Sequence, residues 1–179
     1  MESDLNRNKL YPDLNRLFIN RNIYCKMNKV ITSKVNIFTG LNTRVLDDDK
    51  DMNSLLKELF LMHGLPNVEF YTDSQLFVDS LHVHVHLCII DERLEGSKLQ
   101  GLDVMEILRS MFPEVQIIFY SGTDNPITLK QIIKFRPEGY IDKNMPEALH
   151  ELVKEVVKCL GNIKHNMEFV VKAKEFLKS

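Results

Sequence analysis

The sequence predicts an α/β fold in which a five-stranded parallel sheet carries helices on both faces. From Thr43 onward, short apolar segments alternate with segments whose apolar residues recur at helical spacing, which is the pattern of successive β/α units. The segment Leu87–Ile90 is wholly apolar and shows no polar alternation. A segment of this kind is typical of a strand that is buried on both faces of a parallel sheet.

Five β/α units can be assigned along this part of the chain. We expect strands at Thr43–Leu46, Val68–Tyr71, Leu87–Ile90, Val115–Tyr120 and Glu138–Ile141. We expect helices at about 52–60, 74–80, 101–111, 127–135 and 146–160, where apolar residues recur every three or four positions. Gly64 and Pro66 end the first helix, and Pro126 occupies the first turn of the fourth.

Length and composition fit one soluble domain with extensions. The 179 residues are 44% hydrophobic and 27% charged, and a net charge of −2 predicts no general attraction to nucleic acid or membranes. No apolar run reaches the roughly 18 residues of a spanning helix, and three scattered cysteines predict a reducing, cytoplasmic location. We divide the chain into a poorly ordered N-terminal extension (1–42), a main domain (43–160) and a helical C-terminal extension (161–179).

Four of the predicted strands end in residues that suit metal or phosphoryl chemistry. They are Asp47-Asp48-Asp49, Asp91, Ser121 and Lys143. The carboxyl ends of parallel strands lie at one edge of the sheet, where open α/β sheets bind their ligands. Clustered carboxylates repel one another unless a divalent cation such as Mg²⁺ neutralises them. With the cation and Lys143 nearby, an aspartate could attack a phosphoryl group whose oxygens Ser121 also contacts.

Taken alone, Asp91 is more simply explained as a helix cap, because Asp is a favoured N-cap residue. The four strand ends together resemble the receiver domains of two-component response regulators, the CheY-like superfamily. The resemblance covers residues 43–160 and rests on Val45–Asp48, Leu87–Asp91, Ile117–Gly122 and Gly139–Lys143. It implies a doubly wound, flavodoxin-like sheet with strand order 2-1-3-4-5.

The resemblance also implies a phosphorylation site that works with Mg²⁺ as the cofactor. Asp91 would be the phosphoacceptor, and Lys143 would pair with the phosphoryl group. Asp47 and Asp48 would be the acidic pair that holds Mg²⁺, together with Asp91 and the backbone carbonyl of Arg93. The phosphate would come from a sensor histidine kinase or a histidine phosphotransfer protein of a phosphorelay.

A conformational switch is implied in the same way. Ser121 would contact the phosphoryl group, and Tyr140 would move inward together with Ser121. Arg93 and Thr123, two residues beyond Asp91 and Ser121, would tune the rate of dephosphorylation. The chain would then act as a signalling phosphoacceptor rather than as an enzyme.

Several features depart from the pattern of the family. Arg44 lies in a strand that should be apolar, and Asp49 leaves the register of the acidic pair open by one residue. The loop after Asp91 is about two residues longer than usual, with Glu95 in the position where the family has proline. Lys143 is followed by Asn144 instead of proline.

Two other functions remain open. A haloacid-dehalogenase-like phosphatase would use Asp47 as the nucleophile and Asp49 as the acid/base. Asp51 stands where that family has Thr or Val, and no acidic pair follows Lys143. The other alternative is a receiver-like interaction module that is not phosphorylated.

The predicted C-terminal extension is too short for a DNA-binding or enzymatic domain, which usually has about 50 residues or more. Its apolar residues follow a loose helical pattern, which fits a helix that packs on the domain, dimerises or docks on a partner. The resemblance also implies a possible homodimer through the fourth and fifth helices. We therefore expect a receiver that signals to a downstream protein, with no membrane association.

Overall fold

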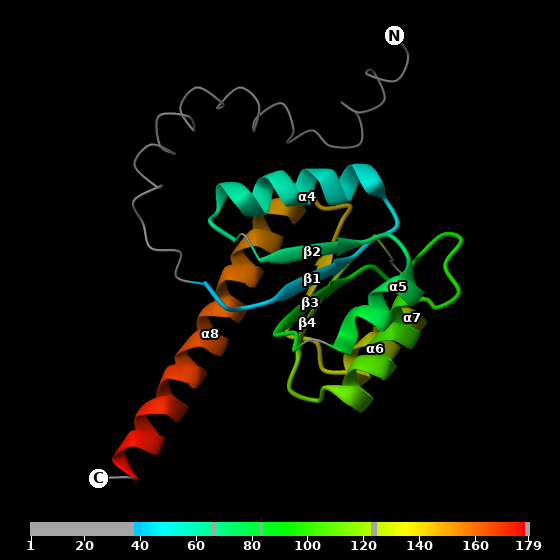
Figure 1. The fold of residues 1–179 in the computed structure, drawn as a ribbon. Coiled ribbons are helices and arrows are strands. Elements are labelled where there is room, and N and C mark those ends of the chain that lie inside the picture. Colours follow the sequence, from blue (N-terminus) through cyan, green and yellow to red (C-terminus); the bar gives the residue numbers. More distant parts are fainter. Residues whose placement is uncertain (1–37, 66, 83, 123–124, 178–179) are drawn as a thin grey trace, which may run out of the picture.

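The structure is a computed structural model that describes residues 38–65, 67–82, 84–122 and 125–177 (Figure 1). Its centre is one sheet with the strand order β2-β1-β3-β4-β5, and all four strand pairs are parallel. The predicted fold class and strand order are therefore confirmed. The strands are β1 (Thr43–Leu46), β2 (Val68–Tyr71), β3 (Leu87–Ile90), β4 (Gln116–Ser121) and β5 (Gly139–Asp142).

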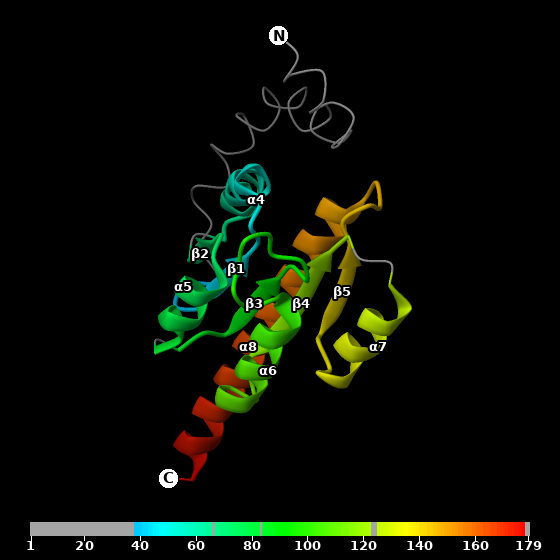
Figure 2. The same ribbon diagram turned by 90° about the vertical axis from the view of Figure 1, so that its right-hand side faces the viewer.

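Helices cover both faces of the sheet (Figures 1 and 2). They are α4 (Lys50–Met62), α5 (Ser74–Asp79) with the short 3₁₀ helix η1 (Ser80–His82), α6 (Gly101–Met111), α7 (Pro126–Lys134) and α8 (Ala148–Phe176). Helices α4 and α8 pack on one face, and α5, α6 and α7 contribute to the core on the other.

The strands supply both halves of the core because successive side chains point to opposite faces. In β3, Ile89 packs with α4 and α8, whereas Cys88 and Ile90 pack with α5 and α6. All four residues of β3 are at most 1% exposed. The wholly apolar sequence of β3 is thus explained by burial on both sides.

Strands β4 and β5 each begin and end one residue later than predicted. The Val115 amide donates to the Phe112 carbonyl within a turn, so it is not part of the sheet ladder. The Glu138 side chain accepts a hydrogen bond from the Ile117 amide at the position where β5 begins. The Val115 side chain is nevertheless buried in the core, as its apolar character predicts.

Arg44 is the polar residue of β1 that the sequence leaves unexplained. Its side chain lies inside the domain, and the residue is 3% exposed. The Nε atom donates to the Glu69 carboxylate on the neighbouring strand at 3.0 Å. Nη1 is buried and has no hydrogen-bond partner among the described residues. The sheet therefore accommodates the guanidinium with only part of its hydrogen-bonding capacity satisfied.

The described end of the predicted N-terminal extension contributes to the core. Phe38 and Leu41 are about 6% and 5% exposed and pack in the cluster that includes Leu56 and Leu152. The Asn42 carbonyl accepts from the amides of His86 and Leu87, which extends the ladder between β1 and β3 by one residue before Thr43. A boundary at residue 43 thus leaves out two core residues, and residues 1–37 lie outside the described part.

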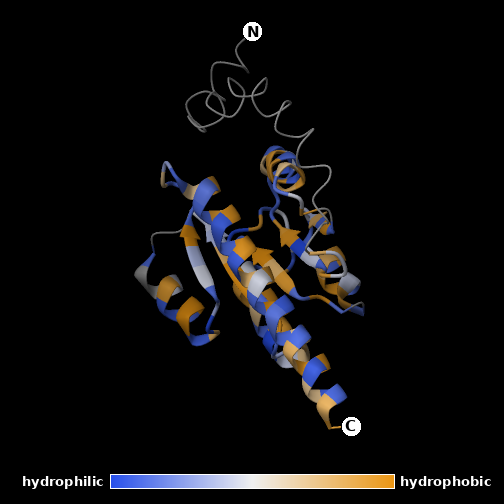
Figure 3. Cartoon of the chain, turned by 90° about the vertical axis from the view of Figure 1, so that its left-hand side faces the viewer, coloured by the Kyte–Doolittle hydropathy of each residue, from blue (hydrophilic) through white to orange (hydrophobic). Residues whose placement is uncertain are grey.

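Helix α8 runs without interruption for 29 residues and passes through Leu160, where the sequence suggested an end. Its first half is buried against the sheet, and its second half extends beyond the domain (Figure 2). The protruding half carries many hydrophobic residues (Figure 3). No described helix is long and apolar enough to cross a membrane.

Candidate functional site

The carboxyl end of β1 presents the first acidic side chain of the site. Asp47 follows the last residue of β1 and is 2% exposed. Its amide donates to the Tyr71 carbonyl, and its carbonyl accepts from the Asn53 side chain at 2.7 Å. Its Oδ1 accepts from the Asp49 amide at 3.0 Å. These contacts fix the turn after β1, so the second carboxylate oxygen points to the edge of the sheet.

The three consecutive aspartates after β1 have two different roles. Asp47 and Asp48 belong to a carboxylate group with Asp91. The Asp49 side chain instead accepts from the amides of Asp51 and Met52 and so forms the N-cap of α4. A cap satisfies backbone donors that have no partner inside the helix. The one-residue ambiguity of the sequence therefore has a geometric answer, in which Asp49 belongs to the helix.

Asp91 lies at the end of β3, next to Asp47. Its amide donates to the Leu46 carbonyl at 2.9 Å, so the parallel ladder with β1 sets its position. Its Oδ1 accepts from the amide of Glu92, the next residue, and its Oδ2 from the Lys143 ammonium. The side chain is 12% exposed, so one part of the carboxylate remains open to solvent.

Lys143 joins the carboxylates across the sheet. It follows β5, and its Nζ lies 2.7 Å from Asp47 Oδ2 and 2.5 Å from Asp91 Oδ2. Nζ also lies 5.3 Å from the centre of the Tyr120 ring, within the range of a cation–π contact. Three strand ends that are distant in sequence thus converge on one ammonium group.

The ionisation of these groups is coupled. Burial raises the pKa of the Asp47 carboxyl above its ordinary value, and the Lys143 ammonium opposes this effect. Burial by itself would lower the pKa of Lys143, but the carboxylates of Asp47 and Asp91 together raise it above its ordinary value. Lys143 therefore remains a cation at neutral pH and offsets part of the repulsion between the two acids.

The three aspartates can hold a hard cation. Asp47, Asp48 and Asp91 each offer an oxygen, and these oxygens lie within 4.8 Å of one another. Carboxylate oxygens at this separation suit Mg²⁺, which binds proteins through one or two carboxylates and keeps several waters. Lys143 carries one positive charge against three carboxylates, so the cluster retains an excess of negative charge. The residues present therefore fit a bound divalent cation.

The predicted switch residues lie beside this cluster. Ser121 ends β4 and is 0% exposed, and its Oγ has no hydrogen-bond partner among the described residues. The Tyr140 ring in β5 is partly buried and stacks on Phe119 with 6.4 Å between the ring centres. The backbone joins the two strand ends, because the Lys143 amide donates to the Ser121 carbonyl.

Arg93 and Thr123 are the two residues predicted to tune dephosphorylation. The Arg93 side chain is 72% exposed and lies 3.8 Å from the Glu92 carboxylate. Thr123 lies outside the described residues. Asn144, which replaces the expected proline, donates from its side chain to the Gly122 carbonyl at 3.1 Å and so links the loops after β4 and β5.

The long loop after Asp91 is held by contacts that the sequence analysis missed. The Gln100 side chain accepts from the Leu94 amide and donates to the Leu94 carbonyl, which closes the loop. Gln100 and Asp103 also form a capping box at the start of α6. The spacing of this pair is a sequence signal of a helix start, although Ser or Thr usually takes the first position.

The same loop is tied to α5 and to the strand end. The Ser74 hydroxyl accepts from the Leu99 amide at 3.1 Å, and the Ser74 amide donates to the Ser97 hydroxyl at 3.4 Å. The Gly101 amide donates to the Glu92 carbonyl, and a Cβ on Gly101 would lie only 2.1 Å from the Asp91 carbonyl oxygen. Glycine is therefore required where α6 meets the strand that carries Asp91.

Comparison with known sequences identifies the family. The family profile of the response regulator receiver domain matches residues 44–156. A putative response regulator NtrX-like from Rickettsia typhi is 30% identical over 104 residues, which are 58% of this chain and 22% of that protein. The nitrogen assimilation regulatory protein NtrX of Azorhizobium caulinodans is 25% identical over 99 residues, 55% of this chain and 22% of that protein. The matched region thus spans about a fifth of these relatives.

Solved structures agree with this result at the level of the fold. The receiver domain of NtrX from Brucella abortus superposes with a TM-score of 0.59 and 21% identity, over 67% of this chain and 98% of that one. A CheY-like receiver domain protein from Methanospirillum hungatei gives a TM-score of 0.62 and 16% identity, over 71% and 98% of the two chains. The chain belongs to the response regulator receiver domain family.

Proposed function

We propose that this chain is a phosphoacceptor receiver that is phosphorylated on Asp91 with Mg²⁺ as the cofactor. The observation that carries the proposal is the convergence of Asp47, Asp48, Asp91 and Lys143 at one edge of the sheet. Asp47 and Asp91 are both hydrogen-bonded to Lys143, but the Asp47 side chain is 3% exposed, whereas Asp91 ends the central strand β3 with a side chain that is 12% exposed. Asp91 is therefore the acid best placed to be the nucleophile.

The donor in this proposal is the phosphohistidine of a sensor kinase or of a histidine phosphotransfer protein. An Asp91 oxygen forms the new bond to phosphorus while the bond between phosphorus and the donor nitrogen breaks. The released imidazole keeps the electron pair of that bond and takes up a proton. Mg²⁺ supplies charge neutralisation, held by Asp47, Asp48, Asp91 and the Arg93 carbonyl.

Lys143 and Ser121 act on the phosphoryl oxygens in this proposal. Phosphorylation replaces the single charge of Asp91 by a group that carries more negative charge and three acceptor oxygens. The Lys143 ammonium then pairs with the phosphoryl group, and the buried Ser121 hydroxyl donates to it. The unsatisfied state of Ser121 Oγ supports this assignment, because a buried hydroxyl without a partner is unfavourable.

Movement of Ser121 toward the phosphoryl group leaves space beside β5. Tyr140 is the aromatic residue on β5 that would follow, and its ring already packs on Phe119. The new position changes the surface around β5 and α7, which a downstream protein would read. Arg93 and Thr123 would set the rate at which water removes the phosphoryl group. We place this signalling in the cytoplasm.

The phosphatase alternative fits the site less well. It requires Asp49 as an acid/base beside Asp47, but the Asp49 carboxylate caps α4. A receiver-like module that is not phosphorylated would not need the coupled Asp47, Asp91 and Lys143 arrangement. A single labelling experiment distinguishes both alternatives from the phosphoacceptor.

The experiment is labelling by a small acyl-phosphate donor in the presence and absence of Mg²⁺. We expect the wild-type chain to be labelled only with Mg²⁺, and Asp91→Asn to abolish labelling. Asp79→Asn changes an exposed carboxylate at the end of α5, outside the acidic cluster, so it is the matched control and should be labelled like wild type. Labelling that survives in Asp91→Asn would refute the assignment of the phosphoacceptor.

The same assay separates the alternatives. Sustained turnover of a phosphomonoester that Asp47→Asn abolishes and Asp91→Asn retains would establish the phosphatase. A folded wild-type chain that no donor labels, with or without Mg²⁺, would establish the unphosphorylated module. A phosphotransfer profile against candidate kinases would then identify the partner.

A further inference from the structure

Asn53 is a polar residue on the buried face of α4. The other buried residues of this helix are all apolar, namely Met52, Leu56, Leu59 and Phe60, whereas Asn53 is an amide that is only 8% exposed. A buried amide is unfavourable unless its donors and acceptors find partners. The contacts of the Asn53 side chain therefore indicate why a polar residue occupies this position.

The Asn53 amide group donates to two backbone carbonyls at the ends of neighbouring strands. Its Nδ2 lies 2.7 Å from the carbonyl oxygen of Asp47, directly after β1, and 3.5 Å from the carbonyl oxygen of Tyr71, the last residue of β2. The Tyr71 carbonyl also accepts from the Asp47 amide at 3.0 Å. The Asn53 side chain thus holds together the carboxyl ends of two strands, at the edge of the sheet where the acidic cluster lies.

The oxygen of the same amide is left without a partner. Asn53 Oδ1 is buried and accepts no hydrogen bond from the described residues. A flipped amide would place Oδ1 against two carbonyl oxygens that have no proton to donate, so these carbonyls require the observed orientation. The fold therefore keeps a donor at both carbonyls although a buried acceptor stays unsatisfied, which is unfavourable for stability.

The Asp47 carbonyl belongs to the peptide that joins Asp47 to Asp48. The six atoms of a trans peptide are nearly coplanar, so a contact that fixes the carbonyl oxygen also fixes the Cα atom of the next residue. Asp48 itself makes no hydrogen bond with another residue in the described part of the chain. The hydrogen bond from Asn53 therefore sets the direction in which the Asp48 side chain leaves the backbone.

The position of Asn53 is fixed by the first turn of α4. Its amide donates to the Asp49 carbonyl at 3.0 Å, and the Asp49 side chain caps the same turn through the amides of Asp51 and Met52. A residue that orients a metal ligand must itself be held to within about 0.5 Å by its surroundings. Burial and the capped turn meet this requirement for Asn53.

We propose that Asn53 is a positioning residue of the Mg²⁺ site, an inference that rests on the proposed function. Asn53 does not contact the metal ion. It holds the peptide between Asp47 and Asp48 so that both carboxylates reach the position that Asp91 also faces. Loss of a group that orients metal ligands typically weakens metal binding by about 10- to 100-fold.

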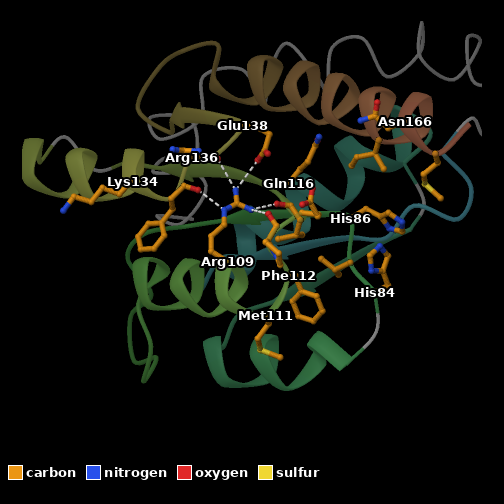
Figure 4. A pocket seen from close by; sticks show the side chains of 17 residues that line it. His84, His86, Arg109, Met111, Phe112, Gln116, Lys134, Arg136, Glu138 and Asn166 are labelled. Atoms are coloured by element: carbon orange, nitrogen blue, oxygen red, sulfur yellow. Dashed lines mark hydrogen bonds and ion pairs between the residues drawn. The ribbon is translucent and has the colours of Figure 1, made fainter. Parts of the chain in front are cut away.

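A side chain with similar contacts lies at the opposite edge of the sheet. The Arg109 guanidinium donates to the carbonyls of Phe135 at 2.8 Å and Arg136 at 3.1 Å, and lines a groove beside the amino ends of β3, β4 and β5 (Figure 4). These contacts join α6 to the loop before β5. Arg109 therefore offers a control in which side-chain donors to backbone carbonyls are lost away from the acidic cluster.

Calorimetric titration of the unphosphorylated full chain with MgCl₂ tests the proposal. Asn53→Leu keeps a branched side chain and removes the donor, and Asn53→Ala removes the whole amide. We expect both variants to bind Mg²⁺ about 10-fold or more weakly than wild type. Leu56→Val, one turn later on the same buried face, and Arg109→Met are the controls. They should lower the midpoint of thermal unfolding and leave the dissociation constant of Mg²⁺ within about twofold of wild type.

Labelling by the acyl-phosphate donor separates the positioning of the metal ligands from the chemical step. The Mg²⁺ concentration that gives half-maximal labelling should rise in both Asn53 variants by the factor that calorimetry measures. The labelling rate at saturating Mg²⁺ should stay close to that of wild type, because Asp91 and Lys143 are unchanged.

Three results would contradict the proposal in different ways. Wild-type affinity for Mg²⁺ in a folded Asn53→Leu or Asn53→Ala variant would overturn the role of Asn53 and leave the proposed function intact. An equal loss of affinity in Leu56→Val would overturn it as well, because loosening of α4 would then explain the effect without the contact to Asp47. A wild-type chain that binds no Mg²⁺ would overturn the proposed function itself.

Discussion

Replacing Gly101 with alanine tests how closely α6 is fitted to the strand that carries Asp91. A Cβ at this position would lie 2.1 Å from the Asp91 carbonyl oxygen and 2.8 Å from the Glu92 Cα. Carbon and oxygen atoms in close contact are about 3.3 Å apart, so the backbone must move by about 1 Å. Both neighbours are backbone atoms, and neither can rotate away. We therefore expect a cost near the upper end of overpacking, about 3 kcal/mol.

The measurement is the midpoint of thermal unfolding, followed by circular dichroism. For a chain of this length, about 3 kcal/mol corresponds to a decrease of roughly 6–12 °C. Gly161→Ala is the matched control, because Gly161 lies within α8 and a Cβ there meets no atom within 4 Å. That control should gain about 0.5–1 kcal/mol from the better helix propensity of alanine.

The result bears on the site as well as on stability. The displaced atoms belong to Asp91 and Glu92, so the Gly101→Ala variant that remains folded should also be labelled more slowly by the acyl-phosphate donor. A variant with the unfolding midpoint of wild type would show that the close contact between α6 and Asp91 is absent in solution. Steric fit against Asp91 would then not be the reason for glycine at position 101.

Four further predictions concern single side chains. Arg44→Met should change the free energy of unfolding by less than about 1 kcal/mol in denaturant titrations. The Arg44 guanidinium is buried and incompletely satisfied and its partner Glu69 is exposed, so their ion pair stabilises little. A loss above about 3 kcal/mol would contradict this. Gln100→Ala should lower the free energy of unfolding by about 1–3 kcal/mol in the same assay, because the Leu94 amide and carbonyl lose their partner. An unchanged denaturation midpoint would show that the loop does not need this contact. Burial raises the pKa of the Cys88 thiol from 9.0 to about 12, so above about pH 9 the unfolded state loses the thiol proton while the folded state keeps it. The free energy of unfolding should therefore fall as the pH rises above about 9. Cys88→Ala should make this fall with pH less steep in the same titrations. Lys143→Met should raise the pKa of the Asp47 carboxyl further, because it removes the cation that opposes the effect of burial. The measurement is an NMR titration of the Asp47 carboxyl. An unchanged pKa would show that the two groups are not coupled.

Much of the fold is determined by local sequence. Strand β3 is wholly apolar, and helices α4 and α6 repeat apolar residues at helical spacing. Both patterns arise because a parallel sheet with helical crossovers buries its central strands on both faces and one face of each helix. Polar residues at the strand ends follow from the same topology, since all carboxyl ends lie at one edge. The sequence was therefore sufficient to select the residues of the candidate site.

Only the tertiary structure decided how those residues are used. The carboxylates of Asp48 and Asp49 are chemically alike and adjacent, and their division between the acidic cluster and the cap of α4 depends on where the helix begins. The partner of Arg44 lies on another strand, and the contact of Gly101 with Asp91 joins segments that a loop separates. These relations depend on distances between residues that are far apart in sequence, and periodicity carries no information about such distances.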